Sequence, residues 1–292
     1  MYKEAGFTSH DVVAKLRGIC GQKKIGHTGT LDPDAVGVLP VCLGNATKLC
    51  DMLTDRSKEY EAVLYLGKET DTQDLSGQVI KEREVDVDPE RVREAILSFV
   101  GGYDQIPPMY SALKVNGKKL YELARAGKEV ERAGRRVEIP SIEILELQIP
   151  EARFRVCCSK GTYIRTLCHD IGIKLGCGGA MKSLKRTRVG EFLIKDSLSL
   201  GEIERLKQEG RLIEQLISVE EMFQEYPRLI LRPDACRMAE NGNALYPSQF
   251  MAQAGFPKEG ERIRVCSQQK RFYGIYAWNA GQGRYQPVKM FL

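Results

Sequence analysis

The run Gly26-His27-Thr28-Gly29-Thr30-Leu31-Asp32-Pro33 places a single acid in a loop punctuated by glycines. Pro33 disfavours the helical region for Asp32, so we expect that residue in an extended or turn conformation. Gly26 and Gly29 allow a sharp turn, or a close approach of a ligand to the backbone. His27 lies in the same loop and can face the same ligand. An ordinary turn would use the same residue types, so the role of the loop depends on the rest of the chain.

Composition bounds the class of protein. The 292 residues are 42% hydrophobic and 28% charged, which indicates two domains or one large domain with an appendage. The net charge of +5 permits a polyanionic partner without proving one. The nine cysteines include no Cys-x-x-Cys pair, which favours reduced thiols over a disulfide framework. No stretch is long enough to span a membrane, so we expect a soluble, cytoplasmic protein.

Metal and nucleotide cofactors are not indicated. The three histidines, His10, His27 and His169, show no metal-ligand spacing with one another or with the cysteines. The chain contains neither a P-loop nor a dinucleotide-binding glycine pattern.

Periodicity predicts an alternation of helices and strands. We expect helices that begin at an N-cap Ser9, at residues 89–100, after Gly161-Thr162 and over residues 202–224. Strands are expected at residues 58–66 and 152–158. Beyond Tyr226-Pro227, short strands are expected at residues 229–231, 262–266, 272–278 and 288–291.

Two segments are rich in basic residues. The segment from Ile106 to Arg136 mixes aromatics with bases, which suits either a solvated surface or an arm that grips nucleic acid. A second cluster, Lys182, Lys185, Arg186 and Arg188, suits phosphate contacts and a solvated face equally well.

Arg165 lies in the first turn of a predicted helix, where its charge opposes the helix dipole at a cost of about 0.3–1 kcal/mol. The position hints at a carboxylate or phosphate partner, although an exposed helix arginine would look the same.

Four segments together resemble the TruB-type tRNA pseudouridine synthases. Residues 26–33 resemble the catalytic loop of that family, Lys58-Glu59-Tyr60 its strand with a base-stacking tyrosine, residues 70–77 its T-D-T-x-D-x-x-G motif, and residues 161–165 its G-T-Y-I-R motif. The segment from Ile106 to Lys119 resembles the thumb insertion of the stand-alone bacterial enzymes. The resemblance covers essentially the whole chain.

The resemblance implies an α+β fold, with a mixed, largely antiparallel central sheet flanked by helices and a small C-terminal β-barrel of the RNA-binding PUA type. It divides the chain into a catalytic domain at residues 1–226, with a thumb-like insertion at about 104–146, and a PUA-like domain at residues 227–292. One departure lies at the N-terminus, where Glu4 stands in place of the family's proline and the first strand is short. We therefore expect the central sheet to lack part of an edge strand.

The resemblance also implies an activity: isomerisation of uridine to pseudouridine at position 55 in the TΨC arm of tRNA. The reaction would need base flipping but no cofactor, metal or guide RNA, and we expect a monomer. Asp32 is the implied catalytic carboxylate. Arg165 would keep Asp32 ionised, since a neighbouring cation lowers the pKa of an acid by roughly 1–3 units.

The remaining implied site residues have supporting roles. Tyr60 would stack on the flipped uracil and could help move its C5 proton. Tyr163 and Leu184 would shape the pocket. Asp74 would orient a neighbour or the substrate, although it could equally cap a turn. The implied RNA-binding residues are His27, Lys48, Lys114, Lys118, Lys119, Lys185 and Arg186.

Two other functions stay open at this level. A guide-dependent synthase of the ribonucleoprotein type would share the catalytic loop, and the thumb-like segment argues against it. A tRNA-binding chaperone without catalysis would not need the set Asp32, Tyr60 and Arg165.

Overall fold

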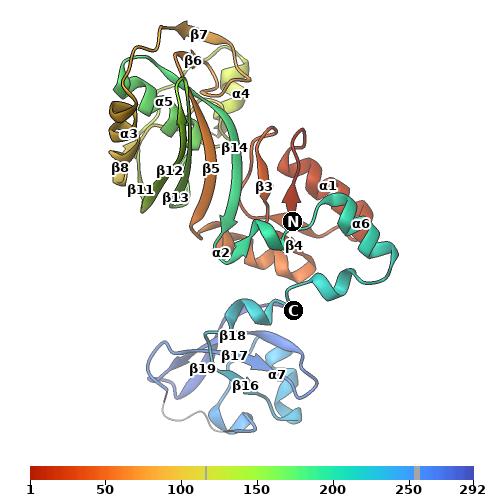
Figure 1. The fold of residues 1–292 in the computed structure, drawn as a ribbon. Coiled ribbons are helices and arrows are strands. Elements are labelled where there is room, and N and C mark those ends of the chain that lie inside the picture. The colour runs from red at the N-terminus through yellow and green to blue at the C-terminus, as the bar shows by residue number, and fades with distance from the viewer. Residues whose placement is uncertain (116, 253–256) are drawn as a thin grey trace. The chain divides into compact units, whose positions relative to one another are not determined.

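The computed structural model describes residues 1–115, 117–252 and 257–292, and the chain forms two compact units (Figure 1). The first comprises Met1–Gly21, Ile25–Val41 and Cys50–Glu204, and the second comprises Gln22–Lys24, Cys42–Leu49 and Arg205–Leu292. Asn116, within the segment that resembles a thumb, lies outside the described residues.

A seven-stranded sheet organises the first unit. The strand order is β1-β3-β14-β5-β13-β12, with β15 paired to β14. Only β3 and β14 run parallel among these neighbours, which confirms the predicted mixed, largely antiparallel sheet. At the β1 edge the pairing with β3 is two residues long. The strands of this sheet are β1 (Tyr2–Lys3), β3 (Val36–Val38), β5 (Lys58–Leu66), β12 (Ser141–Gln148), β13 (Glu151–Cys158), β14 (Gly179–Val189) and β15 (Phe192–Leu193).

One face of this sheet forms the main core. Burial alternates strictly along β5, as a period of two requires for a strand covered on one face. Leu64 of β5 and Phe154 of β13 are fully buried there with Leu167 of α5 (Ile164–Leu175) and Ile96 of α3 (Pro89–Leu97). These two helices lie beside the long central strands in Figure 1. The predicted strands at residues 58–66 and 152–158 are confirmed.

Helix α1 (Ser9–Cys20) begins one residue away from its predicted cap. Thr8, not Ser9, is the N-cap: its Oγ1 accepts from the Asp11 backbone N–H at 3.1 Å, and Asp11 Oδ2 accepts from the Thr8 N–H at 2.8 Å. This reciprocal capping box leaves Ser9 facing the interior, 1% exposed.

Helix α5 begins at Ile164, later than the predicted start at Gly161-Thr162. Tyr163 is the N-cap residue, and Gln105, at the end of β8 (Gly101–Gln105), holds its backbone in place. Its Oε1 accepts from the Tyr163 N–H at 2.7 Å, and its Nε2 donates to the Tyr163 carbonyl at 2.9 Å. Arg165 therefore lies in the first turn, as predicted.

The predicted continuous helix over residues 202–224 is wrong. Helix α6 (Leu200–Gln208) ends before Gly210, whose positive φ of 73° breaks the helix, and two short 3-10 turns follow.

The other elements outside the two main sheets are β2 (Ile25–His27), β4 (Val41–Leu43), η1 (Gly44–Leu49), α2 (Cys50–Thr54), β6 (Lys68–Thr70), β7 (Val79–Glu82), β9 (Lys114–Val115), β10 (Lys118–Lys119), α4 (Leu120–Arg125), β11 (Arg135–Ile139), η2 (Ile194–Asp196), η3 (Leu212–Gln215), η4 (Glu220–Phe223), η5 (Pro233–Ala235), α7 (Cys236–Glu240) and η6 (Pro247–Gln249).

The second unit carries a four-stranded sheet with its own core. Its order is β16-β17-β18-β19, and the buried side chains of Leu231, Val265 and Tyr276 pack together beside it. The last strand begins at Arg284, earlier than the predicted 288. The bounds are β16 (Arg228–Ile230), β17 (Arg262–Cys266), β18 (Phe272–Asn279) and β19 (Arg284–Met290).

Candidate active site

Asp32 lies in the loop between β2 and β3. Buried side chains hydrogen-bond the backbone of this loop just before and just after Asp32. The buried Ser9 accepts from the Leu31 N–H at 3.0 Å. Lys3, also fully buried, donates from Nζ to the carbonyls of Pro33 at 2.8 Å and Ala35 at 2.6 Å. Sequence reasoning missed Lys3, because nothing in a two-residue strand distinguishes a buried lysine from an exposed one.

Arg165 forms an ion pair with Asp32 through two of its nitrogens. Nε lies 3.0 Å from Asp32 Oδ2, and Nη2 donates to Oδ1 at 3.2 Å. The same guanidinium donates to the carbonyls of Thr72 at 2.9 Å and Tyr110 at 2.8 Å. The arginine side chain is 6% exposed and the aspartate side chain 38% exposed. The cation is thus fixed in place while the carboxylate stays open to a ligand.

The pKa of Asp32 is raised above its ordinary value. Burial is the largest cause, and the carboxylate of Asp74 adds to it. Arg165 and Lys3 lower this pKa but do not reverse the shift. Arg165 therefore acts on this pKa in the predicted direction, and burial acts in the opposite direction because it penalises the charged carboxylate.

Asp74 combines both of the roles considered for it. Its Oδ1 accepts from the hydroxyl of Thr72 at 2.7 Å and from the Ser76 N–H at 3.0 Å, as a turn cap does. Its Oδ2 lies 3.8 Å from Arg165 Nε. The turn thereby presents a second carboxylate to the arginine that holds Asp32.

Tyr60, Leu184 and Leu31 belong to one buried cluster with the start of α5. Burial raises the pKa of Tyr60, so its phenol stays neutral at ordinary pH, and this disfavours a role as a phenolate base. Tyr163 is half-buried at the N-cap of α5, and burial raises its pKa as well. Leu31 and Ile164, the chain neighbours of Asp32 and Arg165, belong to the same buried cluster, so apolar side chains pack beside the ion pair.

Comparison with known protein families identifies the family of the chain. Residues 17–164 match the N-terminal domain of TruB family pseudouridylate synthases, and residues 165–224 match the C-terminal domain of tRNA pseudouridylate synthase B. The chain belongs to the TruB family.

Similar TruB family proteins span nearly the same length. Proteins named tRNA pseudouridine synthase B are 52% identical in Lachnoclostridium phytofermentans, over 100% of this chain and 98% of the relative, and 46% identical in Bacillus cereus, over 100% and 96%. Another, in Alkaliphilus oremlandii, is 49% identical over 94% of this chain and 90% of the relative.

Two solved structures share the fold. One is described as an H/ACA RNP bound to a substrate RNA containing 2'-deoxyuridine, and the other as a Cbf5-Nop10-Gar1 complex. Both match with a TM-score of 0.70, at 25% and 26% identity, over 100% of this chain and 83% of theirs.

The residues predicted to bind RNA differ in location and in exposure in this TruB family chain. Lys114, Lys118 and Lys119 lie on the β9–β10 hairpin, and Lys185 is exposed on β14. Within the second unit, Lys48 donates to the carbonyls of Met290 and Leu292. His27 is half-buried, and burial lowers its pKa.

Arg186 does not fit the prediction. Its side chain is buried, with the residue 1% exposed, and therefore cannot contact RNA in this conformation. The prediction of Arg186 as an RNA-binding residue is wrong, because β14 turns this side chain to the same covered face as Leu184.

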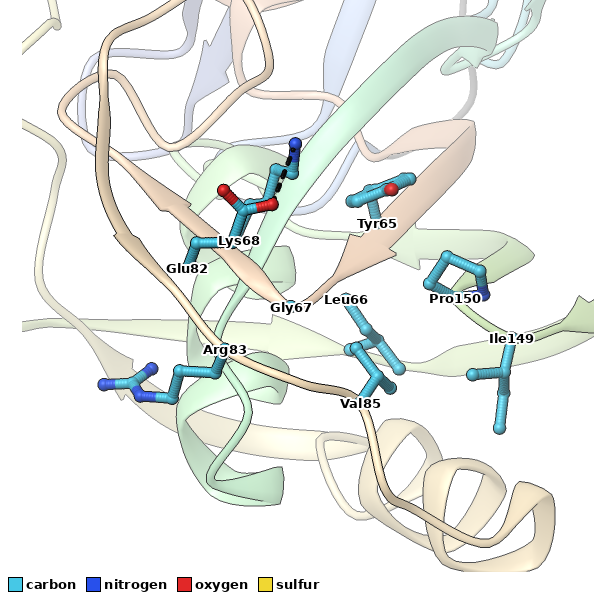
Figure 2. Close-up of a pocket in the computed structure, with 9 residues that line it drawn as sticks. All are labelled: Tyr65, Leu66, Gly67, Lys68, Glu82, Arg83, Val85, Ile149 and Pro150. Atoms are coloured by element: carbon cyan, nitrogen blue, oxygen red, sulfur yellow. Dashed lines mark ion pairs between the residues drawn. The ribbon is translucent and has the colours of Figure 1, made fainter.

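A separate pocket of about 320 Å³ lies at the other end of β5 (Figure 2). Tyr65, Leu66 and Pro150 line it, with the ion pair of Lys68 and Glu82 at its side. It is about 20 Å along the strand from Tyr60 and contains none of the predicted site residues.

Within the described residues, no His, Cys, Asp and Glu side chains gather into a group able to hold a metal, and no helix is long and apolar enough to cross a bilayer.

Proposed function

We propose that this TruB family chain isomerises uridine to pseudouridine at position 55 in the TΨC arm of tRNA, as a stand-alone monomer in the cytoplasm. The contact of Asp32 with both Nε and Nη2 of Arg165 is the observation that carries the proposal, because it fixes the carboxylate of Asp32 beside the buried cluster that contains Tyr60 and Leu184. The names of the relatives support tRNA as the substrate.

The reaction breaks the C1′–N1 bond and forms a C1′–C5 bond; the proton on C5 leaves to solvent and N1 takes up a proton, so the product is an isomer of the substrate. The reaction involves no net oxidation or reduction and transfers no phosphoryl group, so no cofactor is required. The target uridine must leave its stack, at a cost of a few kcal/mol, and the cluster of Tyr60 and Leu184 would receive it. Asp32, ionised, would act as the nucleophile or as the base that removes a ribose proton.

RNA binding is proposed to use two surfaces. The lysines of the β9–β10 hairpin, of which Lys114 and Lys118 are exposed and Lys119 is half-buried, would neutralise phosphates. The C-terminal sheet at residues 227–292 would act as a PUA-like module, and we retain 1–226 as the catalytic domain with its insertion at about 104–146.

Release of tritium from a T-arm stem-loop labelled at uridine C5 tests the proposal. The wild type should release the label without metal, cofactor or guide. Asp32→Asn should lower release at saturating RNA by at least about 100-fold, since a positioned proton-transfer group typically contributes 10²–10⁴-fold. RNA binding should be retained. Release by a pure Asn variant at near the wild-type rate would refute the assignment of Asp32.

The guide-dependent alternative is favoured by one observation, the match to a structure described as an H/ACA RNP bound to a substrate RNA. Wild type that releases label only when a guide RNA is added would establish it. Wild type that binds the stem-loop but never releases label would favour a chaperone.

A further inference from the structure

Arg186 is among the largest fully buried side chains of the protein, although it carries a full charge. No ion pair between its guanidinium and a carboxylate is found among the described residues. Burial of an unpaired cation costs several kcal/mol unless polar groups compensate it. The polar groups that compensate the buried charge of Arg186 therefore indicate its role.

Those partners lie on either side of Asp32 in the sequence. Arg186 Nε donates to the Val38 carbonyl at 2.7 Å, and Nη2 donates to the Gly29 carbonyl at 3.2 Å. Gly29 has a positive φ of 78°, so the chain bends where the guanidinium binds it. One rigid, planar group thereby joins the two ends of the segment that carries Asp32.

The backbone of Arg186 reinforces the same attachment. Arg186 is in register with Gly37 in the parallel pair β3–β14, and a Cβ atom at Gly37 would lie 2.1 Å from the Arg186 carbonyl oxygen. The strand that leaves the catalytic loop is therefore packed directly against Arg186.

Tyr60 completes the set. It is in register with Arg186 across β5 and β14, and the nearby positive charge of Arg186 lowers the pKa of its phenol against the larger, opposite effect of burial. The arginine thus binds the loop with the implied catalytic acid and lies beside the implied base-stacking tyrosine, on the side that faces the interior.

We propose that Arg186 is a positioning residue, which holds the Asp32 loop and the Tyr60 ring at the separation that the uracil and its ribose require. It acts through these groups and does not touch the RNA. The inference rests on the proposed function, because it assigns Asp32 and Tyr60 to the same reaction centre.

Three variants test it by tritium release and by RNA binding. Arg186→Met keeps the length of the side chain but removes every donor, and we expect kcat to fall by about 10–100-fold, since a misplacement of about 1 Å can cost 100-fold. The KM and the Kd for RNA should stay within about threefold. Arg186→Lys keeps the charge but not the fork, and should restore part of the lost kcat.

Arg188→Met is the matched control. Arg188 lies on the same strand, and its contacts are with Ser57, Glu59, Cys157 and Gly190, away from the loop. It should keep the wild-type kcat. All assays are run well below the melting temperature of the least stable variant. If Arg186→Met does not fold, Arg186→Lys is tested instead, and its kcat should fall below that of the wild type while the KM and the Kd for RNA stay within about threefold.

Hydrogen exchange separates this proposal from the proposed function. Amides in residues 29–38 should exchange faster in the Arg186 variant than in the wild type, whether or not the wild type is active on the stem-loop. A folded Arg186→Met variant with wild-type kcat, or with kcat and RNA affinity lost in parallel, would overturn the positioning role. Unchanged exchange in the loop would also overturn it.

Discussion

At the scale of single residues, the site is a balance of charges around one acid. Burial and Asp74 favour the protonated form of Asp32, while Arg165 and Lys3 favour the ionised form. These groups come from four parts of the chain: the loop between β6 and β7, helix α5, strand β1 and the catalytic loop. The state of Asp32 is therefore set by tertiary structure.

The pH dependence of the reaction should report this balance. The proposed mechanism requires ionised Asp32, so we expect the rate to rise with pH through the pKa of this carboxyl group. Because the charge on Asp74 raises that pKa, Asp74→Asn should move the acidic limb of the pH–rate profile to lower pH. The Asn oxygen can still accept the hydrogen bonds from Thr72 and Ser76 that cap the turn.

Asp71→Asn is the control, because Asp71 lies in the same turn but accepts from the Gln78 N–H and the Tyr110 hydroxyl instead of facing Arg165. Its acidic limb should stay at the wild-type pH. A limb that moves to higher pH in Asp74→Asn would mean that Asp74 does not act on Asp32 through its charge.

Residue-level prediction from the sequence succeeded where local pattern was sufficient. An arginine in the first turn of a helix signalled a carboxylate partner, and Arg165 contacts two. Arg186 was misassigned, although a signal existed: the expectation that Leu184 faces a pocket places Arg186 on the same covered face, two residues along the strand. Lys3 gave no such signal.

At the scale of elements, the site depends on how closely α5 packs on β14. A Cβ atom at Gly172 of α5 would lie 2.1 Å from the backbone N of Gly179. The Gly178 N–H also donates to the Gly172 carbonyl at 3.0 Å. Only glycine allows this approach of the helix that carries Arg165 to the start of β14.

Gly172→Ala should therefore destabilise the protein by about 1–3 kcal/mol, the usual cost of overpacking a core, and lower the melting temperature by several degrees. Gly18→Ala in α1 is the same exchange in a helix, at a position where the new methyl group meets nothing within 4 Å. It should stabilise by about 0.5–1 kcal/mol. Equal effects of the two changes on thermal unfolding would contradict the packing argument.

The sequence predicted the presence of helices and strands better than it predicted the residues at which they begin and end. The alternation along β5 is a local property, and that strand was found with its bounds. The start of α5 depends on Gln105, far away in the sequence, and no local pattern could supply it. The cap of α1 was missed by one residue because Thr8 and Ser9 are both good caps, and tertiary contacts decide between them.

At the scale of the whole molecule, the second unit has its own core, so it is expected to contribute RNA affinity and little to the chemistry. A cut at the expected boundary, Tyr226-Pro227, would strip Phe223 of its contacts with the rings of Phe272 and Phe291, at 6.2 and 5.6 Å between centroids. Removal of residues 218–292 avoids this exposed ring.

This truncated protein should bind a T-arm stem-loop at least about tenfold more weakly at a fixed salt concentration, a loss of roughly 1.4 kcal/mol. Its rate of tritium release at saturating RNA should change by less than its affinity, because Asp32, Arg165 and Tyr60 all lie in the first unit. The retained melting transition of the first unit is the control for folding. An equal Kd for the full and truncated chains would place RNA recognition in the first unit, and the lysines of the β9–β10 hairpin would then be the next residues to replace.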